Sequence, residues 1–130
     1  KIAAGEIPSA TLYEDEDFRV ILDLGPASKG HALILPKEHY KDLCELDDAV
    51  AVKVLPLAGK MGRAMKKALH FDGFNLVQNN GEAAGQTVMH FHMHMIPRYA
   101  NGPQMVLWNP GKLDDTEKTE IIEKVKKELE

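Results

Sequence analysis

Three histidines alternate with apolar residues between positions 90 and 96, and no other stretch concentrates so much potential chemistry. The order is His90, Phe91, His92, Met93, His94, Met95 and Ile96. In an extended strand successive side chains point to opposite faces, so the three imidazoles share one face and the apolar side chains share the other. Imidazoles can supply a nucleophile, a proton donor or metal ligands. The pattern therefore predicts a strand with one buried face and one chemical face.

Two simpler interpretations compete with catalysis. Histidines at i and i+2 can bind one zinc ion, but the Cα atoms of His90 and His94 would lie roughly 13 Å apart in a straight strand, from a rise of about 3.3 Å per residue. All three could reach one ion only if the strand bent. Alternatively, the histidines are exposed by chance on a half-buried strand. The loop that precedes them favours a reactive site.

That loop is glycine-rich and polar, and it spans residues 78–87. Its glycines allow turns that aim successive backbone amides at one point, and such nests hold anionic oxygens. Asn79, Gln86 and Thr87 add neutral hydrogen-bonding side chains. Taken alone, an Asn-Asn-Gly sequence is also an ordinary hairpin turn. Beside aligned histidines, the loop is typical of a phosphate-binding cradle.

His92, the middle histidine, is the expected nucleophile, since it has a neighbouring imidazole on either side. A free imidazole has a pKa of about 6.5, so near neutral pH most of it is uncharged and able to attack an electrophile. Attack on phosphorus would divide one difficult displacement into two easier steps through a covalent intermediate. Donors around the phosphate oxygens would then stabilise the charge that moves to the leaving group.

The elements that must position these residues predict a single α+β domain. Short apolar runs bounded by turns indicate strands, and apolar residues at steps of three and four indicate helices. The second helix is expected to turn Ile121, Ile122, Val125 and Leu129 inward. The expected strands are Ala10–Glu14, Phe18–Asp23, His31–Leu35, Phe74–Gln78 and Met89–Arg98, and the expected helices are Asp47–Leu69 and Thr116–Leu129.

Asp47 or Asp48 is the expected cap of the long helix, and Pro56 is the local objection to that helix, because an interior proline removes a hydrogen bond. His31 and His39 flank the third strand, and a lone histidine is more often a satisfied structural residue than a ligand. Trp108 is expected to anchor the tail to the core or to cover a ligand site.

Composition limits the class of protein. The chain has 130 residues, a net charge of −4 and one cysteine, Cys44, and its isoelectric point is about 5.9. This acidity argues against a nucleic-acid polymer as partner. One cysteine excludes an internal disulfide and suits a reducing compartment. No apolar run reaches the length of a membrane span, and no secretory signal opens the sequence. We therefore expect a cytoplasmic protein without a membrane partner.

Residues 85–98 resemble the signature of the histidine-triad (HIT) family, in which histidines alternate with apolar residues. Blocks from Gly5 to His39 are similar to the N-terminal half of small bacterial, Hint-like members, and the similarity covers most of residues 1–98. The resemblance implies one HIT domain over residues 1–130. Its fold would be a five-stranded antiparallel sheet with a long central helix and a C-terminal helix, continued as a ten-stranded sheet across a homodimer.

The resemblance also implies residue roles. His92 would attack the α-phosphate of a purine nucleotide derivative, His94 would touch the phosphate or leaving group, and the main chain of His90 would help to orient His92. Asp23 falls on the position that binds the ribose hydroxyls. The phosphate-contacting positions are Asn79, the Gly85 amide, Gln86 and Thr87, and the base-pocket positions are Ile2, Ile7, Ile21, Leu22 and Leu24.

The sequence departs from the family pattern at one point. Many bacterial relatives carry a Cys-x-x-Cys pair just before the position of Lys1, which binds structural zinc together with equivalents of His39 and His90. The printed sequence has no such pair, and Cys44 is misplaced for it. We expect no metal and no required cofactor, with structural zinc only if a short N-terminal piece is missing.

Three functions are consistent with these residues. The first is hydrolysis of adenosine 5′-phosphoramidate-like substrates through a nucleotidyl-histidine, releasing a nucleoside monophosphate. The second is hydrolysis of dinucleoside polyphosphates, against which Asn79 argues modestly, because that branch often has glutamine there. The third is a non-catalytic nucleotide-binding or scaffold protein that retains the site.

Overall fold

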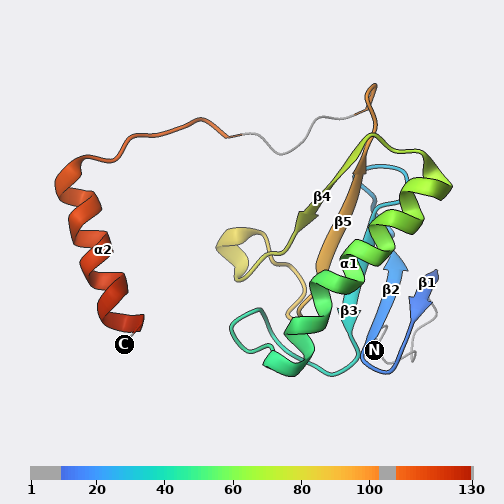
Figure 1. Ribbon diagram of the computed structural model, residues 1–130, viewed down its shortest axis with the longest axis horizontal. Coiled ribbons are helices and arrows are strands. Elements are labelled where there is room, and N and C mark those ends of the chain that lie inside the picture. The colour runs from blue at the N-terminus through green and yellow to red at the C-terminus, as the bar shows by residue number, and fades with distance from the viewer. Residues whose placement is uncertain (1–9, 103–107, 130) are drawn as a thin grey trace.

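A computed structural model of the chain describes residues 10–102 and 108–129. The elements follow the order expected from the sequence (Figure 1). The strands are β1 (Thr11–Glu14), β2 (Phe18–Leu22), β3 (Ala32–Pro36), β4 (Gly73–Val77) and β5 (Met93–Arg98). The helices are α1 (Asp48–Leu69), the short 3₁₀ helix η1 (Glu82–Ala84) and α2 (Asp115–Leu129).

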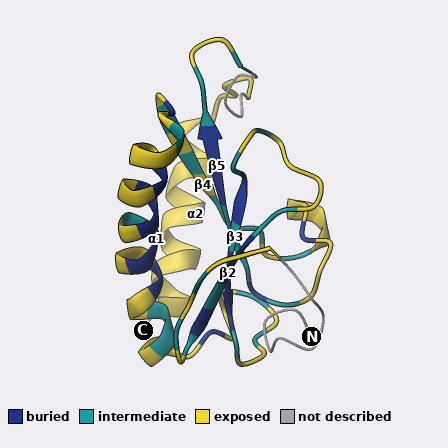
Figure 2. Ribbon diagram, turned by 90° about the vertical axis from the view of Figure 1, so that its right-hand side faces the viewer, coloured by how far each residue is buried: buried dark blue, intermediate teal, exposed yellow. Residues whose placement is uncertain are grey.

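The five strands form one antiparallel sheet in the order β1-β2-β3-β5-β4. Helix α1 crosses one face of this sheet and turns its buried side toward it (Figure 2). Apolar side chains of β2, β3 and β5 meet those of α1 in the core. Fully buried examples are Val20, Ile34 and Met95. The fold class expected from the sequence, α+β with a five-stranded antiparallel sheet, is confirmed.

Local chemistry explains both ends of α1. The Asp47 carboxylate accepts a hydrogen bond from the Ala49 amide at 3.2 Å, which satisfies one of the free amides of the first turn. At the other end His70 adopts a left-handed conformation, and its amide donates to the Lys66 carbonyl. The helix continues through Pro56. The carbonyl that loses its partner there belongs to Val52, a residue that is 70% exposed, so water can take the place of the missing donor.

Strand β5 is shorter than expected. The predicted strand began at Met89, whereas β5 begins at Met93, so only His94 of the three histidines lies within the sheet. It faces Leu33 of β3 and Val77 of β4 in register. The ladder stops because the chain bends away: the Phe91 amide donates to the Tyr40 carbonyl, beyond the end of β3.

Helix α2 departs further from the prediction. Figure 1 shows it standing away from the sheet and α1, and none of its described residues is buried. The four apolar side chains expected to face inward are all about half exposed or more: Ile121, Ile122, Val125 and Leu129. Trp108 is also exposed, at 78%, so it does not anchor the tail. An apolar stripe on a helix predicts that the stripe is buried, but it does not identify the surface against which the helix packs. Neither helix α1 nor α2 combines the length and apolar character needed to cross a membrane.

Candidate active site

His92 lies just before β5, and its ring is held by main chain. Its Nδ1 is 2.7 Å from the carbonyl oxygen of His90. A carbonyl oxygen can only accept a hydrogen bond, so Nδ1 carries the proton. In a neutral ring Nε2 then holds the free lone pair. The nitrogen that could attack an electrophile is thus Nε2. The hydrogen bond from Nδ1 to the His90 carbonyl sets the orientation of the ring.

The three histidines do not form one row. The rings of His92 and His94 are neighbours, with centroids 5.0 Å apart. His90 instead turns its ring to His39, at a centroid distance of 5.1 Å, and its Nε2–H donates to the Pro36 carbonyl. The bend of the chain before β5 accounts for this split. The His90 ring is thus used within the protein, and its main-chain carbonyl is the acceptor beside His92 Nδ1.

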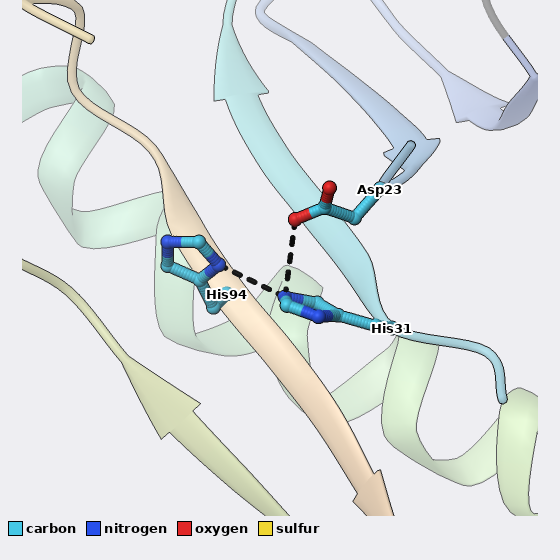
Figure 3. A group of neighbouring side chains, drawn as sticks. All are labelled: Asp23, His31 and His94. Atoms are coloured by element: carbon cyan, nitrogen blue, oxygen red, sulfur yellow. Dashed lines mark hydrogen bonds and ion pairs between the residues drawn. The ribbon is translucent and has the colours of Figure 1, made fainter. Parts of the chain in front are cut away.

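His31 completes the cluster around His94, although it was expected to be structural. It is buried, and its Nε2 lies 2.9 Å from Nδ1 of His94 (Figure 3). The sequence placed His31 beside a strand. It could not show that β3 pairs with β5 in the register that brings this strand end next to His94. Long-range register is set by tertiary packing, which explains why the contact was missed.

The loop between β4 and β5 is turned by two glycines in the left-handed region. Gly81 has a φ of 92° and Gly85 a φ of 94°, and they flank η1. Such angles are costly for residues that carry a Cβ. Within this turn the Gly85 amide already donates to the Glu82 carbonyl at 2.9 Å. The structure therefore does not support the expectation that this amide contacts a phosphate.

Gln86 likewise differs from its expected role. Its side chain is only 2% exposed and is used inside the protein. Its Oε1 accepts from the Gly81 amide at 2.8 Å, and its Nε2 donates to the carbonyls of Lys41 and Val88. Both amide hydrogens are thus occupied. Gln86 holds the loop against the segment after β3 and is not available to donate to a phosphate.

Backbone amides that could donate to an anion follow directly after Gln86. The backbone amides of Thr87, Val88, Met89 and His90 donate to no acceptor in the described parts of the chain. Thr87 is exposed, and the side chain of Asn79 lies beside Gly85, where an added Cβ would come 3.6 Å from Asn79 Nδ2. An anion cradle beside His92 would use these amides, Asn79 and Thr87.

The residues expected to bind ribose and base are only partly described. Asp23 is 22% exposed in its side chain, and its Oδ1 accepts from the Gly25 amide while Oδ2 lies 3.4 Å from His31 Nε2. Ile21 is buried and packs against Leu35. Leu22 is half-buried, whereas Leu24 is 92% exposed. Ile2 and Ile7 lie outside the described residues, so the base pocket stays a prediction.

His39 and His90 fit half of a zinc site. Their Nδ1 atoms are 3.0 Å apart. Because His90 Nε2–H donates to the Pro36 carbonyl, the Nδ1 lone pair of the neutral ring faces His39. Structural zinc usually takes four ligands, and these two histidines would supply only two of them. The expectation that the chain requires no metal stays a prediction.

Burial favours the neutral form of three of the histidines. It lowers the pKa of His31, and the Arg98 cation acts in the same direction against the opposing effect of Asp23. Burial also lowers the pKa of His90, with the Pro36 carbonyl opposing it. For His94, burial is again the main cause of a lowered pKa, and the neighbouring His92 and His31 add to it.

These lowered pKa values predict that the protein loses stability in mild acid. Below the ordinary histidine value of 6.5, the unfolded chain takes up protons that the folded chain does not. As the pH is lowered, the free energy of unfolding should therefore decrease by up to about 1.4 kcal/mol per pH unit for each histidine. The decrease from each histidine ends when the pH reaches the lowered pKa of that group in the folded protein. Urea unfolding between pH 7.5 and 5.5 measures this slope. The variant His31→Gln should show a shallower slope, and a flat profile in the wild type would contradict the assignment.

Comparisons with known proteins agree on one family. The profile of the HIT domain matches residues 4–101. Among solved structures, SMU.412c from Streptococcus mutans superposes with a TM-score of 0.92 at 41% identity, covering 100% of this chain and 83% of that one. An adenosine 5′-monophosphoramidase of Saccharomyces cerevisiae is 36% identical over 99% of this chain and 77% of its own length. An adenylylsulfatase of Arabidopsis thaliana is 46% identical over 75% of this chain and 50% of its own length.

Proposed function

Because the chain belongs to the histidine-triad family, with a match to the HIT domain over residues 4–101, we propose that it hydrolyses adenosine 5′-phosphoramidate-like nucleotides. The main support for this proposal is the position of the proton on the His92 ring. Its Nδ1–H donates to the His90 carbonyl, so Nε2 is left as a nucleophile. Relatives named adenosine 5′-monophosphoramidase and adenylylsulfatase support an adenylyl group as the part transferred.

The reaction would proceed in two displacements. His92 Nε2 attacks the α-phosphorus, and its bond to phosphorus forms as the phosphorus–nitrogen bond of the substrate breaks. The amine leaves with a proton from a neighbouring imidazole, which regains one from the attacking water in the second step. Water then attacks the same phosphorus, the histidine–phosphorus bond breaks, and a nucleoside monophosphate is released. The amides of residues 87–90, which have no acceptor within residues 10–102 and 108–129, would donate to the phosphate oxygens, and such donors act where negative charge develops. Asp23 would accept from the ribose hydroxyls.

The proposal is tested by the choice of substrate. A fluorogenic adenosine 5′-monophosphate amide and a diadenosine polyphosphate are offered separately to the purified protein, and product formation is followed. Turnover of the amide in preference to the polyphosphate supports the phosphoramidase. The reverse preference identifies a dinucleoside polyphosphate hydrolase. Binding of adenosine monophosphate without turnover of either substrate identifies a non-catalytic nucleotide-binding protein.

We also propose that the protein is a homodimer, and that it works in the cytoplasm. Strand β4 is an edge of the described sheet, and its Phe74 and Leu76 are partly exposed. Helix α2 presents Ile121, Ile122 and Val125 to solvent, and the superposition on the S. mutans protein spans the whole chain, this helix included. Apolar surface of this kind marks an interface between proteins.

Sedimentation is expected to give twice the chain mass of 14.5 kDa at micromolar concentration. Glutamate at Ile121 and Val125 would place two charges within the apolar surface of α2, and the mass should then shift toward the monomer. Glutamate in place of the neighbouring Thr119 and Lys126 is the matched control, because these residues lie outside the apolar stripe. A monomeric wild type would contradict the homodimer.

A further inference from the structure

Asp23, His31 and His94 form a compact cluster from three separate segments of the chain (Figure 3). One nitrogen or oxygen atom of each lies within 4.8 Å of the others. His31 Nε2 is central, at 2.9 Å from His94 Nδ1 and 3.4 Å from Asp23 Oδ2. Two imidazoles and a carboxylate are a common set of metal ligands. Whether a metal fits depends on where the protons are.

The main chain decides the position of the proton on His31. The Ala27 amide donates to His31 Nδ1 at 3.0 Å, so Nδ1 must offer a lone pair. A neutral ring has one N–H, which is then on Nε2. Nε2 is the very atom that faces His94 and Asp23, and a metal there would have to displace its proton and leave an imidazolate. The cluster is therefore better understood as a chain of hydrogen bonds.

The tautomer of His31 also determines the tautomer of His94. The proton on His31 Nε2 has its shorter contact to Nδ1 of His94 and its longer one to Asp23. His94 Nδ1 must therefore accept, which leaves the proton of the neutral His94 ring on Nε2. From this geometry, and resting on the function proposed above, we infer that His31 is a positioning residue that fixes His94 as an Nε2–H donor toward the substrate.

The two neighbouring rings then have opposite roles. His92 offers a lone pair at Nε2, because the His90 carbonyl accepts from its Nδ1–H. His94 offers an N–H at Nε2, because His31 donates to its Nδ1. One ring can attack phosphorus while the other donates to a phosphate oxygen or to the leaving group. Burial of His31 and His94, which lowers both pKa values, favours the neutral rings that this arrangement requires.

The segment that carries His31 is fastened to β5 and to Asp23. The Ser28 hydroxyl donates to the Pro97 carbonyl at 2.6 Å, and the Tyr99 hydroxyl donates to the Lys29 carbonyl at 2.8 Å. The Asp23 amide donates to the carbonyl of His31 at 2.9 Å. His31 therefore cannot easily turn its ring away from His94, and the direction of the hydrogen-bond chain is built into the fold.

The first test reads the protons directly and needs no activity. In protein labelled with ¹⁵N-histidine, long-range ¹H–¹⁵N correlations at pH 7.5 identify the tautomer of each ring. We expect the proton on Nε2 for both His31 and His94, and on Nδ1 for His92. A His94 ring with its proton on Nδ1 would overturn the inference whatever the enzyme turns over. Addition of equimolar Zn²⁺ should leave the His31 Nε2 proton in place, and its loss would favour a metal site instead.

The second test asks whether the donor matters for the reaction. His31→Gln keeps an N–H that can reach His94, whereas His31→Leu keeps bulk without a donor. The leucine variant should lose about 10- to 100-fold in kcat with amine leaving groups, with a smaller change in KM. The glutamine variant should recover most of that loss. Equal kcat in the two variants would contradict a positioning role. If the leucine variant fails to fold, the wild-type tautomers and the glutamine variant still decide the question.

These tests separate the inference from the function on which it rests. A wild type with the expected tautomers but no turnover would remove the proposed hydrolase and leave the hydrogen-bond chain intact. A wild type that turns over the amide with the opposite His94 tautomer would do the reverse.

Discussion

His92→Ala is expected to lower turnover of the adenosine monophosphate amide by at least about 1,000-fold, because it removes the atom that bonds to phosphorus. Water would then have to attack the substrate directly. The fold should persist, since His92 is only half-buried and its one described hydrogen bond is to the His90 carbonyl. Steady-state kinetics measure the loss, and thermal unfolding confirms that the variant is folded.

Mass spectrometry provides the decisive companion measurement. Wild type quenched during turnover should carry one nucleotidyl group on the peptide that contains His92, and the alanine variant should carry none. His90→Ala is the matched control, because it removes an imidazole from the same segment but keeps the carbonyl that orients His92. Its loss in kcat should be far smaller. Residual turnover within tenfold of wild type in His92→Ala would mean that another group attacks.

Gln86→Met should be the most destabilising single change in the loop, at about 2–4 kcal/mol. Methionine has a similar shape but cannot replace the three hydrogen bonds that the buried amide makes with Gly81, Lys41 and Val88. The Gly81 amide and two carbonyls would then have to find water or remain unpaired. Urea unfolding at pH 7.5 measures the difference in free energy.

The neighbouring residue separates a structural role from a phosphate contact. Thr87→Val changes an exposed side chain with no described hydrogen bond, so its stability should change by less than about 0.5 kcal/mol. If Gln86 instead contacted the substrate directly, Gln86→Met would keep its stability and raise KM. A stable Gln86→Met variant would therefore overturn the anchoring role given to this residue.

Much of the fold could be predicted because its signals are local. The apolar stripe and the Asp47 cap define α1, and short apolar runs bounded by turns identify β2 and β3. The choice of His92 rested on local order as well. The failures concern contacts between distant segments. Nothing near Gln86 in the sequence indicates that Lys41 accepts its hydrogen bond, and nothing near His31 indicates that His94 is its neighbour.

Helix α2 also shows that local sequence does not predict contacts between distant segments. Its apolar residues are correctly placed on a helix, yet the helix finds no burial in the described chain. Similarly, the strand predicted from Met89 was too long, because side-chain alternation continues where hydrogen bonding between strands has already ended. Periodicity reports the conformation of a segment. It does not report the partner of that segment.

The two groups that fix the tautomers of His92 and His31, the His90 carbonyl and the Ala27 amide, are both main-chain atoms. Every amino acid carries that carbonyl, and every one except proline carries that amide. Any residue except proline at position 27 therefore keeps the amide that donates to His31 Nδ1. In a saturation library at Ala27, proline is the one substitution that would remove the backbone N–H that donates to His31 Nδ1.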